Sequence, residues 1–274
     1  MILFTPAKIN LGLHVGPLRP DGYHEIQTAL YSVNWFDAVE AIPAETFSFS
    51  CYGEPCGNEE DNLCVKAWQL FHQETACPPV HLFLLKHIPA GAGLGGGSSD
   101  AAATLRLLDQ LFPGRATEQQ IRQWAERLGS DCAFFLQELP ALAFGRGEQL
   151  IPVAVDLSSY VLVLAVPDIH VSTSWAYAEL DCRLLPRPPA ENLREVLQLP
   201  VSNWAKYLRN DFETVVFEKY PLLADLKEWM YRQGALYASM SGSGSCIYGI
   251  FESIPRQKPE GMPFRAWKVF SPEN

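Results

Sequence analysis

A glycine-rich segment at residues 89–103, PAGAGLGGGSSDAAA, most constrains what this chain can fold into. The apolar stretch before it, residues 80–88, predicts a buried strand, and leucines at helical spacing predict a helix over 101–112. The glycines therefore occupy a strand-to-helix turn. Because glycine lacks a Cβ, such a turn adopts positive φ and lets backbone N–H groups approach an anion closely. The segment predicts a phosphate-binding loop.

The residues that follow the glycines support this interpretation. Ser98 and Ser99 lie at the predicted start of the helix, where free N–H groups and the helix dipole favour a phosphate. Asp100 is itself an anion, so we expect it to cap the helix instead. The alternative is a surface loop without a ligand, but so many glycines in one joint favour phosphate binding.

Three other nucleotide motifs fit this segment poorly. A Walker A loop needs Gly-Lys-Ser/Thr, which is absent from the chain. Gly91, Gly93 and Gly96 match the spacing of the dinucleotide fingerprint, but a second helix-like stretch, 117–128, follows where a strand is required. The protein-kinase glycine loop is excluded because neither His-Arg-Asp nor Asp-Phe-Gly occurs in the sequence.

Strand-like stretches precede helices in both halves of the chain, which indicates an α+β fold instead of alternating α/β. The predicted strands cover 2–15, 28–41, 46–52, 80–88, 141–155, 160–166, 236–251 and 266–270, and the predicted helices begin at Leu63, Ser98 and Thr117 or cover 211–219 and 222–233. Residues 183–191 are rich in proline and predict a surface loop. Asn210 and Glu213 have the spacing of a capping box.

Composition narrows the class of partner. The formal net charge of −10 argues against a nucleic-acid or anionic-membrane surface, so an anionic substrate must be held by a local site. No apolar run reaches transmembrane length, and the start of the chain lacks a signal-peptide pattern. The seven cysteines are scattered and predict reduced thiols in the cytoplasm, without a disulfide framework or a zinc site.

The glycine segment resembles the phosphate loop of the GHMP small-molecule kinases, and two further segments match that family in the same order. Residues 6–11, PAKINL, resemble its first motif through Lys8, Asn10 and Leu11. Residues 241–245, SGSGS, resemble its glycine-rich third motif. The resemblance spans nearly the whole chain and implies a kinase that uses ATP and Mg²⁺.

Two more segments narrow the resemblance within the family. Residues 19–25, RPDGYHE, and 128–135, LGSDCAFF, are similar to those of a member that acts on a cytidine-diphosphate alcohol. The resemblance implies an α+β fold of two domains with the active site in the cleft between them, and we place these domains at 1–152 and 153–274. We expect a small-molecule substrate, no nucleic-acid or membrane partner, and a monomer or weak homodimer.

The first strand places two polar side chains on one face. Ile9 and Leu11 alternate with Lys8 and Asn10, so the lysine and the asparagine point the same way. From the strand alone, a solvated face explains this pattern. The resemblance implies instead that Lys8 is a catalytic lysine and that Asn10 faces the substrate.

Asp131 lies between Gly129-Ser130 and an apolar run, where a carboxylate is either a helix cap or a buried charge with a partner. The resemblance makes it the base that takes the proton from the substrate hydroxyl. Lys8 is then its natural partner, because an ammonium group keeps the carboxylate ionised, orients the hydroxyl and offsets charge on the γ-phosphate.

A turn dipeptide at residues 21–22 displays Tyr23 and His24 at the start of a strand. Locally these are a packed ring and an exposed ring. The resemblance implies a pyrimidine pocket in which Tyr23 stacks on cytosine and His24 hydrogen-bonds its edge. It also assigns Tyr177 to the opposite face of the base and Thr173 to a polar contact, although Tyr177 equally suits a core.

The residues that the resemblance assigns to ATP are Pro89, Ala90, Gly91, Ala92, Gly93, Leu94, Gly95, Gly96, Gly97, Ser98 and Ser99, together with Asn62 and Lys86 near the adenine. From the residues alone, Asn62 is also a helix cap and Lys86 a solvated charge at a strand end. The Ser99 hydroxyl is a candidate Mg²⁺ ligand, and spacing indicates no second one.

Two alternatives to this function stay open at the level of sequence. One is another GHMP kinase that acts on a sugar, homoserine or a mevalonate-like alcohol. The other is a non-catalytic GHMP-fold protein that binds a nucleotide or a partner. The presence of Lys8, Asp131 and the full glycine loop argues against the second, since a binding module needs no base.

Overall fold

The computed structural model describes residues 1–137, 139–181 and 192–272. The predicted loop at 183–191 lies outside them. The chain forms two compact units, the first made of Met1–Lys8, Ser32–Ala90 and Gly95–Glu138, and the second made of Ile9–Tyr31, Gly91–Leu94 and Leu139–Asn274. Each unit is thus made of segments that are not continuous along the chain. The domain boundary at residue 152 stays a prediction.

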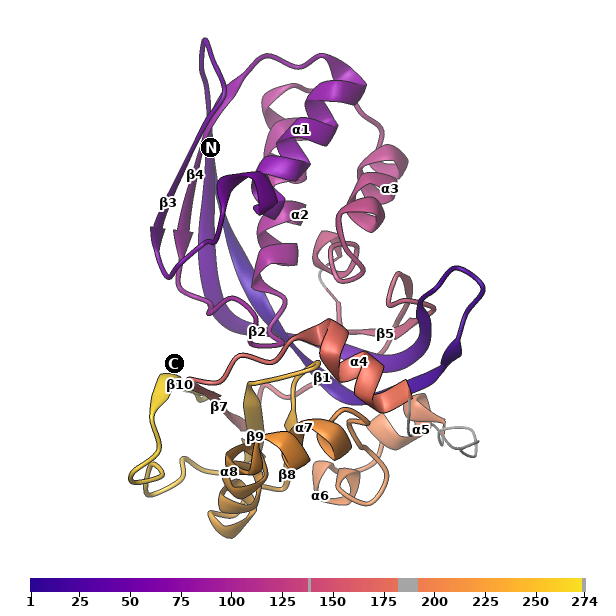
Figure 1. Cartoon of the computed structure of the whole chain (residues 1–274), viewed down its shortest axis with the longest axis vertical. Coiled ribbons are helices and arrows are strands. Elements are labelled where there is room, and N and C mark those ends of the chain that lie inside the picture. The colour runs from indigo at the N-terminus through magenta and orange to yellow at the C-terminus, as the bar shows by residue number, and fades with distance from the viewer. Residues whose placement is uncertain (138, 182–191, 273–274) are drawn as a thin grey trace. The chain divides into compact units, whose positions relative to one another are not determined.

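The first unit combines strands with a layer of helices. Its elements are parts of β1 (Ile2–Leu18) and β2 (His24–Pro43), then β3 (Ser48–Gly53), η1 (Glu59–Asp61), α1 (Leu63–Thr75), β4 (Val80–Lys86), α2 (Gly96–Leu111), α3 (Glu118–Leu128) and η2 (Phe134–Leu136). The second half of β2 pairs antiparallel with β4, whose other neighbour, β3, runs parallel to it. Figure 1 shows α1, α2 and α3 gathered on one side of β3 and β4.

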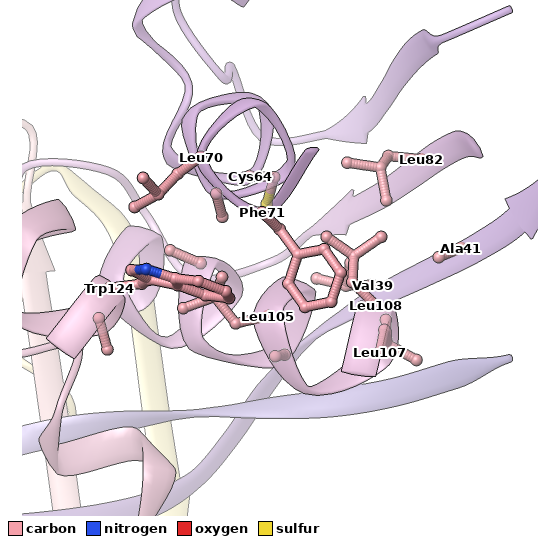
Figure 2. Close-up of a cluster of buried hydrophobic side chains, with 14 of the residues drawn as sticks. Val39, Ala41, Cys64, Leu70, Phe71, Leu82, Leu105, Leu107, Leu108 and Trp124 are labelled. Carbon is pink, nitrogen blue, oxygen red and sulfur yellow. The ribbon is translucent and has the colours of Figure 1, made fainter. Parts of the chain in front are cut away.

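The core of this unit follows from the alternation on β4. Leu82 and Leu84 are buried under the helices, whereas Leu85 on the other face is exposed. Phe71 reaches from α1 toward Val39 of β2 (Figure 2) and meets the Trp124 ring edge to face at a centroid distance of 5.5 Å. Burying such side chains contributes about 1.5–3 kcal/mol each, which fixes the helices over the strands that lead into the glycine loop.

The helix boundaries have local causes. Thr117 and Gln120 form a complete capping box at the start of α3, as local sequence favours. The helix α1 ends at Ala76, which adopts the left-handed conformation. The helix α2 begins at Gly96, earlier than predicted, because Gly95 with φ of +69° serves as its N-cap. The glycine loop therefore leads directly into the helix.

The second unit contains its own antiparallel sheet in the order β10-β7-β9-β8. Its elements are β5 (Ala141–Phe144), β6 (Gln149–Pro152), β7 (Val161–Pro167), α4 (Thr173–Asp181), α5 (Leu193–Leu197), α6 (Val201–Trp204), α7 (Glu213–Lys219), α8 (Pro221–Arg232), β8 (Tyr237–Met240), β9 (Ile247–Phe251) and β10 (Phe264–Phe270). In this unit the first half of β2 pairs with β5, and β5 pairs with β6. The α+β class predicted from the sequence is confirmed.

Two predicted strands are each divided in the structure. The stretch 141–155 forms the hairpin of β5 and β6, and the stretch 236–251 forms β8 and β9. The reason for the second break is the conformation of Gly242 and Gly244, whose φ values of +56° and +98° turn the chain back on itself. The third glycine-rich motif is therefore a loop between paired strands.

The cysteine prediction is wrong for one pair. Cys51 and Cys56 form a disulfide, with Cα atoms 6.6 Å apart where the chain turns after β3. Cys182 lies outside the described residues. The free cysteines in the described part of the chain, Cys64, Cys77, Cys132 and Cys246, are all buried. Among the described helices, none has the length and apolar character needed to cross a membrane.

Candidate active site

Lys8 and Asp131 form an ion pair in the first unit. The Lys8 Nζ atom lies 3.2 Å from Asp131 Oδ2, and the side chains are 5% and 30% exposed. Asp131 belongs to the turn after α3, which Cys132 closes by donating its backbone N–H to the Gly129 carbonyl. Asp131 is therefore a partly exposed charge with a partner and not the N-cap of η2, a position that Ala133 holds.

The second half of the glycine loop lies against this pair. A Cβ built on Gly95 would meet Lys8 Cγ at 2.9 Å and Phe135 Cζ at 3.1 Å. Because a Cβ contact at 2.9 Å would force the lysine to shift, and because φ is +69°, glycine is favoured where the lysine stem packs on the loop. The catalytic lysine predicted by the resemblance is thus next to the start of α2.

The first turn of α2 has the polar groups of an anion site. The first N–H groups of a helix have no intrahelical acceptor, and the Gly96, Gly97 and Ser98 amides occupy these positions. The Ser99 Oγ atom is buried and has no hydrogen-bond partner among the described residues. A buried hydroxyl without a partner is costly, so Ser99 fits a role toward a bound phosphate or its metal ion.

The first half of the glycine loop packs on the third motif in the second unit. Ser241 Oγ donates to the Gly93 carbonyl at 2.8 Å, and the Cys246 N–H donates to the Ala92 carbonyl at 3.1 Å. A Cβ on Gly93 would collide with the Ser241 carbonyl oxygen, so glycine is required there. Two motifs whose contacting residues are 148 positions apart in the chain therefore meet.

Asn10 belongs to the same group in the second unit. Its Nδ2 donates to Thr28 Oγ1 at 3.1 Å, and its Oδ1 lies 3.5 Å from Ser241 Oγ. Lys8 and Asn10 are only 4% and 3% exposed, so the solvated strand face that the alternation allowed is not what the structure shows.

The aromatic residues predicted for the pyrimidine are partly brought together. The His24 and Tyr177 rings stack with centroids 5.2 Å apart, and Tyr177 also packs edge to face on Phe212. Tyr23 is 53% exposed, and the Arg146 guanidinium lies 4.8 Å from its ring centroid. These contacts leave the Tyr23 side chain accessible to a flat ligand.

The polar groups around these rings are also defined. His24 Nδ1 is 3.0 Å from the Gly16 carbonyl oxygen. In the tautomer with the proton on Nδ1, the imidazole donates a hydrogen bond to this carbonyl. Thr173 Oγ1 lies 2.8 Å from Ser243 Oγ. The predicted polar contact residue is therefore bonded to the third motif.

The two residues predicted near the adenine have structural roles of their own. Asn62 caps α1, because its Oδ1 accepts from the Cys64 N–H at 2.9 Å. Lys86 is 4% exposed, so the alternative of a solvated charge is wrong. Its ammonium group donates to Asp37 and, at 2.9 Å, to Asp100. Whether either residue contacts a nucleotide stays a prediction.

The expectation for Asp100 is also corrected. Gly95 holds the cap position of α2, and Asp100 lies inside the helix with 1% of its surface exposed. The carboxylate faces the interior because Thr5 Oγ1 and Lys86 Nζ both donate to it. The negative charge of Asp100, which would repel a phosphate, is therefore directed into the protein.

Sequence reasoning missed the role of Asn210. The expected capping box does not form, since Phe212 is the N-cap of α7 and has no side-chain cap. Asn210 Nδ2 instead donates to the Met240 and Gly242 carbonyls at 2.8 and 2.7 Å, and Glu213 Oε1 accepts from the Met240 N–H. No local pattern signals this, because both partners are about 30 residues further along the chain.

These features define a class of protein. An α+β chain in which a lysine and a carboxylate pair against a glycine loop at a helix start has the groups of a small-molecule kinase. Family models agree, since the GHMP kinases N terminal domain matches residues 62–138 and the GHMP kinases C terminal domain matches residues 190–259. The two matches lie on either side of the predicted boundary at residue 152.

Individual proteins give the same result. A 4-diphosphocytidyl-2-C-methyl-D-erythritol kinase of Bacteroides thetaiotaomicron is 45% identical over 97% of this chain and 96% of its own. A crystal structure of 4-(cytidine 5'-diphospho)-2C-methyl-D-erythritol kinase has a TM-score of 0.75 at 34% identity, over 91% of this chain and 90% of that one. A crystal structure of mevalonate kinase, at 12% identity and a TM-score of 0.66 over 92% and 91%, shares the fold.

The chain belongs to the GHMP kinase family. It is a small-molecule kinase that uses ATP, so the predicted family, fold and class of enzyme are confirmed.

Proposed function

We propose that this chain uses ATP to phosphorylate the 2-hydroxyl of 4-diphosphocytidyl-2-C-methyl-D-erythritol in the non-mevalonate route to isoprenoid precursors. Similarity to kinases of that name, at 45% and 34% identity over nearly the whole chain, supports the substrate. The observation that carries the chemistry is the ion pair of Lys8 and Asp131, 3.2 Å apart and packed against Gly95.

Asp131 acts as the general base. It accepts the proton of the substrate hydroxyl while the hydroxyl oxygen forms its bond to the γ-phosphorus and the bond to the β-phosphate oxygen breaks. Lys8 lies within ion-pair distance of this carboxylate, and its ammonium group offsets the negative charge on the transferred group. Little else is needed beyond positioning, because phosphoryl transfer involves no covalent intermediate here.

The glycine loop holds the triphosphate. The Gly96, Gly97 and Ser98 amides at the start of α2 supply N–H donors, and Ser99 supplies a buried hydroxyl that has no protein partner among the described residues. Ser99 would hold Mg²⁺ through that hydroxyl, and the ion would supply positive charge that offsets the charge of the phosphates. No group of three or more His, Cys, Asp or Glu side chains in the described part of the chain is arranged as a metal site.

The cytidine end of the alcohol binds at Tyr23, His24 and Tyr177, with Thr173 and Asn10 as polar contacts. The exposure of Tyr23 and the stacked pair of His24 and Tyr177 support this pocket. Aromatic stacking on a base is worth ~1–3 kcal/mol, enough to select a cytidylyl substrate from simple alcohols. We further propose that the enzyme is cytoplasmic and is a monomer or a weak dimer. It has no nucleic-acid or membrane partner, and the net charge of −10 supports this last point.

A coupled assay of ADP release tests this proposal with a panel of alcohols. We expect turnover with the cytidylyl alcohol and none of comparable efficiency with free methylerythritol, galactose, homoserine or mevalonate. Efficient phosphorylation of one of the other alcohols would replace the proposed substrate and retain the kinase. No ADP release with any alcohol, from folded protein that binds ATP, would favour a non-catalytic binding protein.

A further inference from the structure

A cluster of buried charges lies beneath the glycine loop in the first unit. Lys86 at the end of β4 donates to Asp37 of β2 and to Asp100 of α2, and all three side chains are at most 5% exposed. Thr5 Oγ1 of β1 adds a hydrogen bond to Asp100 Oδ1 at 2.7 Å. Side chains from β1, β2, β4 and α2 therefore meet at one ammonium group.

The cluster binds the chain at both ends of the loop. Asp37 Oδ1 accepts from the backbone N–H groups of His87 and Ile88, the residues that lead from β4 into the loop. Asp100 lies just beyond the first turn of α2, where the loop ends. The same set of hydrogen bonds thus holds the chain immediately before the glycines and immediately after them.

The ammonium group also lies directly under the first residue of the helix. A Cβ on Gly96 would be 2.8 Å from Lys86 Nζ, so the close approach of the lysine requires glycine at this position. Lys86 points into the protein, where the two carboxylates surround it, and not toward solvent. Its side chain acts on the loop from the interior.

Hydrophobic side chains would fill this space at lower cost. Charges removed from water carry a large desolvation penalty, and buried ion pairs are often less stabilising than well-packed apolar groups of similar volume. Burial alone would lower the pKa of Lys86, but Asp100 and Asp37 raise it above its ordinary value, so the lysine stays charged. A buried charged cluster with a high desolvation cost fits a role in setting the geometry of the glycine loop.

We propose that Lys86, with Asp37 and Asp100, is the positioning centre of the phosphate loop. It fixes the end of β4 to α2 so that the amides of the first helical turn are set for the phosphates before ATP binds. This inference rests on the proposed binding of ATP by that loop. It makes Lys86 a positioning residue whose side chain does not touch the nucleotide.

Calorimetry with ATP alone, together with steady-state kinetics, tests the proposal. Lys86→Met and Asp100→Ala should weaken ATP binding at least tenfold and raise KM for ATP. KM for the cytidylyl alcohol should stay within twofold. Asp100→Asn keeps an oxygen that accepts from Lys86, so this conservative variant should bind ATP within about threefold of the wild-type affinity.

Two comparisons separate positioning from stability. Lys86→Met/Asp100→Leu removes both partners of one ion pair, so its unfolding temperature should recover relative to Lys86→Met while its ATP affinity should not. Leu82→Ala is the matched control, because it leaves a cavity in the same strand while Lys86, Asp37 and Asp100 are all retained. It should lower the unfolding temperature and leave ATP affinity unchanged.

Three results would overturn the proposal: the double variant regains ATP affinity together with stability, Leu82→Ala weakens ATP binding as much as Lys86→Met, or Asp100→Ala binds ATP like the wild type. A wild-type protein that binds ATP but does not phosphorylate the cytidylyl alcohol would contradict the proposed substrate alone. The calorimetric comparison needs no alcohol, so it still decides the role of Lys86.

Discussion

At the scale of single residues, Lys8 and Asp131 have environments in the structure that differ from those that the local sequence suggests. On the first strand, alternation alone suits a solvated lysine, and the turn before residue 132 suits a cap. In the structure Lys8 is buried, and its ammonium group pairs with a carboxylate that is 30% exposed. A partly exposed carboxylate beside a buried lysine is suited to accept a proton, with the ammonium group as its charged neighbour.

Asp131→Asn should keep the fold and ATP binding but lose most turnover. The amide is nearly isosteric yet cannot accept the hydroxyl proton, and loss of a general base costs about 10²–10⁴-fold in kcat. Steady-state kinetics and calorimetry with ATP measure the two effects. Asp225→Asn on α8, an exposed carboxylate, is the control and should keep wild-type turnover. Wild-type turnover in Asp131→Asn would mean that the carboxylate is structural.

Tyr23→Ala and Tyr177→Ala should each raise KM for the cytidylyl alcohol by the equivalent of ~1–3 kcal/mol, the worth of one stacking contact on a base. KM for ATP should change little. Tyr52→Ala, which removes an exposed ring from β3, serves as the control. If the first two variants weaken the use of ATP instead, the pyrimidine pocket is misplaced and only the kinase assignment survives.

At the scale of elements, the need for glycine in the loop depends on the neighbouring side chains as much as on the φ angles of the loop. Gly95 and Gly114 both have positive φ, at +69° and +78°. A Cβ on Gly114 meets nothing within 4 Å, whereas a Cβ on Gly95 meets Lys8 and Phe135. An alanine would therefore have similar backbone strain at the two positions but would meet different neighbours.

Gly95→Ala and Gly114→Ala form a matched pair for this reason. Both should lose about 1 kcal/mol of unfolding free energy through the unfavourable φ. Only Gly95→Ala should also displace Lys8 and raise KM for ATP, by tenfold or more. Urea unfolding and steady-state kinetics measure the two quantities. Equal ATP affinity in both variants and the wild type would show that Gly95 does not shape the phosphate site.

At the scale of the whole molecule, the buried Asp100 couples stability to pH. Burial raises the pKa of the Asp100 carboxyl to about 6, and nearby Asp37 adds to this rise while Lys86 opposes it. Because the folded pKa is above the unfolded value of about 4, this group stabilises the fold fully only below pH 4. Its contribution is lost as the pH rises through 6.

The comparison of wild type with Asp100→Asn, which cannot ionise, isolates this effect. Between pH 7.5 and 5 the wild type should gain about 1–1.5 kcal/mol of unfolding free energy relative to the variant. Urea denaturation at both pH values measures the difference, and other titrating groups cancel because both proteins contain them. A difference that does not change with pH would show that Asp100 does not titrate in this range.

The sequence by itself determined the local structure and the chemistry of the main motif. Successive glycines between an apolar strand and a leucine-rich helix left few conformations other than a positive-φ turn, and Gly91, Gly93 and Gly95 adopt it. Alternation predicted the strands, and the Thr117 pattern matched a helix start. These features follow from residues that are neighbours in the chain, whose φ, ψ and periodicity require no knowledge of distant partners.

Only the tertiary structure decided which buried polar groups meet. Asp100, expected to cap a helix, is a partner of Lys86, and Asn210, expected to form a capping box with Glu213, donates to the loop after β8. The disulfide of Cys51 and Cys56 depended on how the chain turns after β3. A polar side chain removed from water has to find whatever partner the packing brings near, and that partner is set by contacts between segments far apart in sequence.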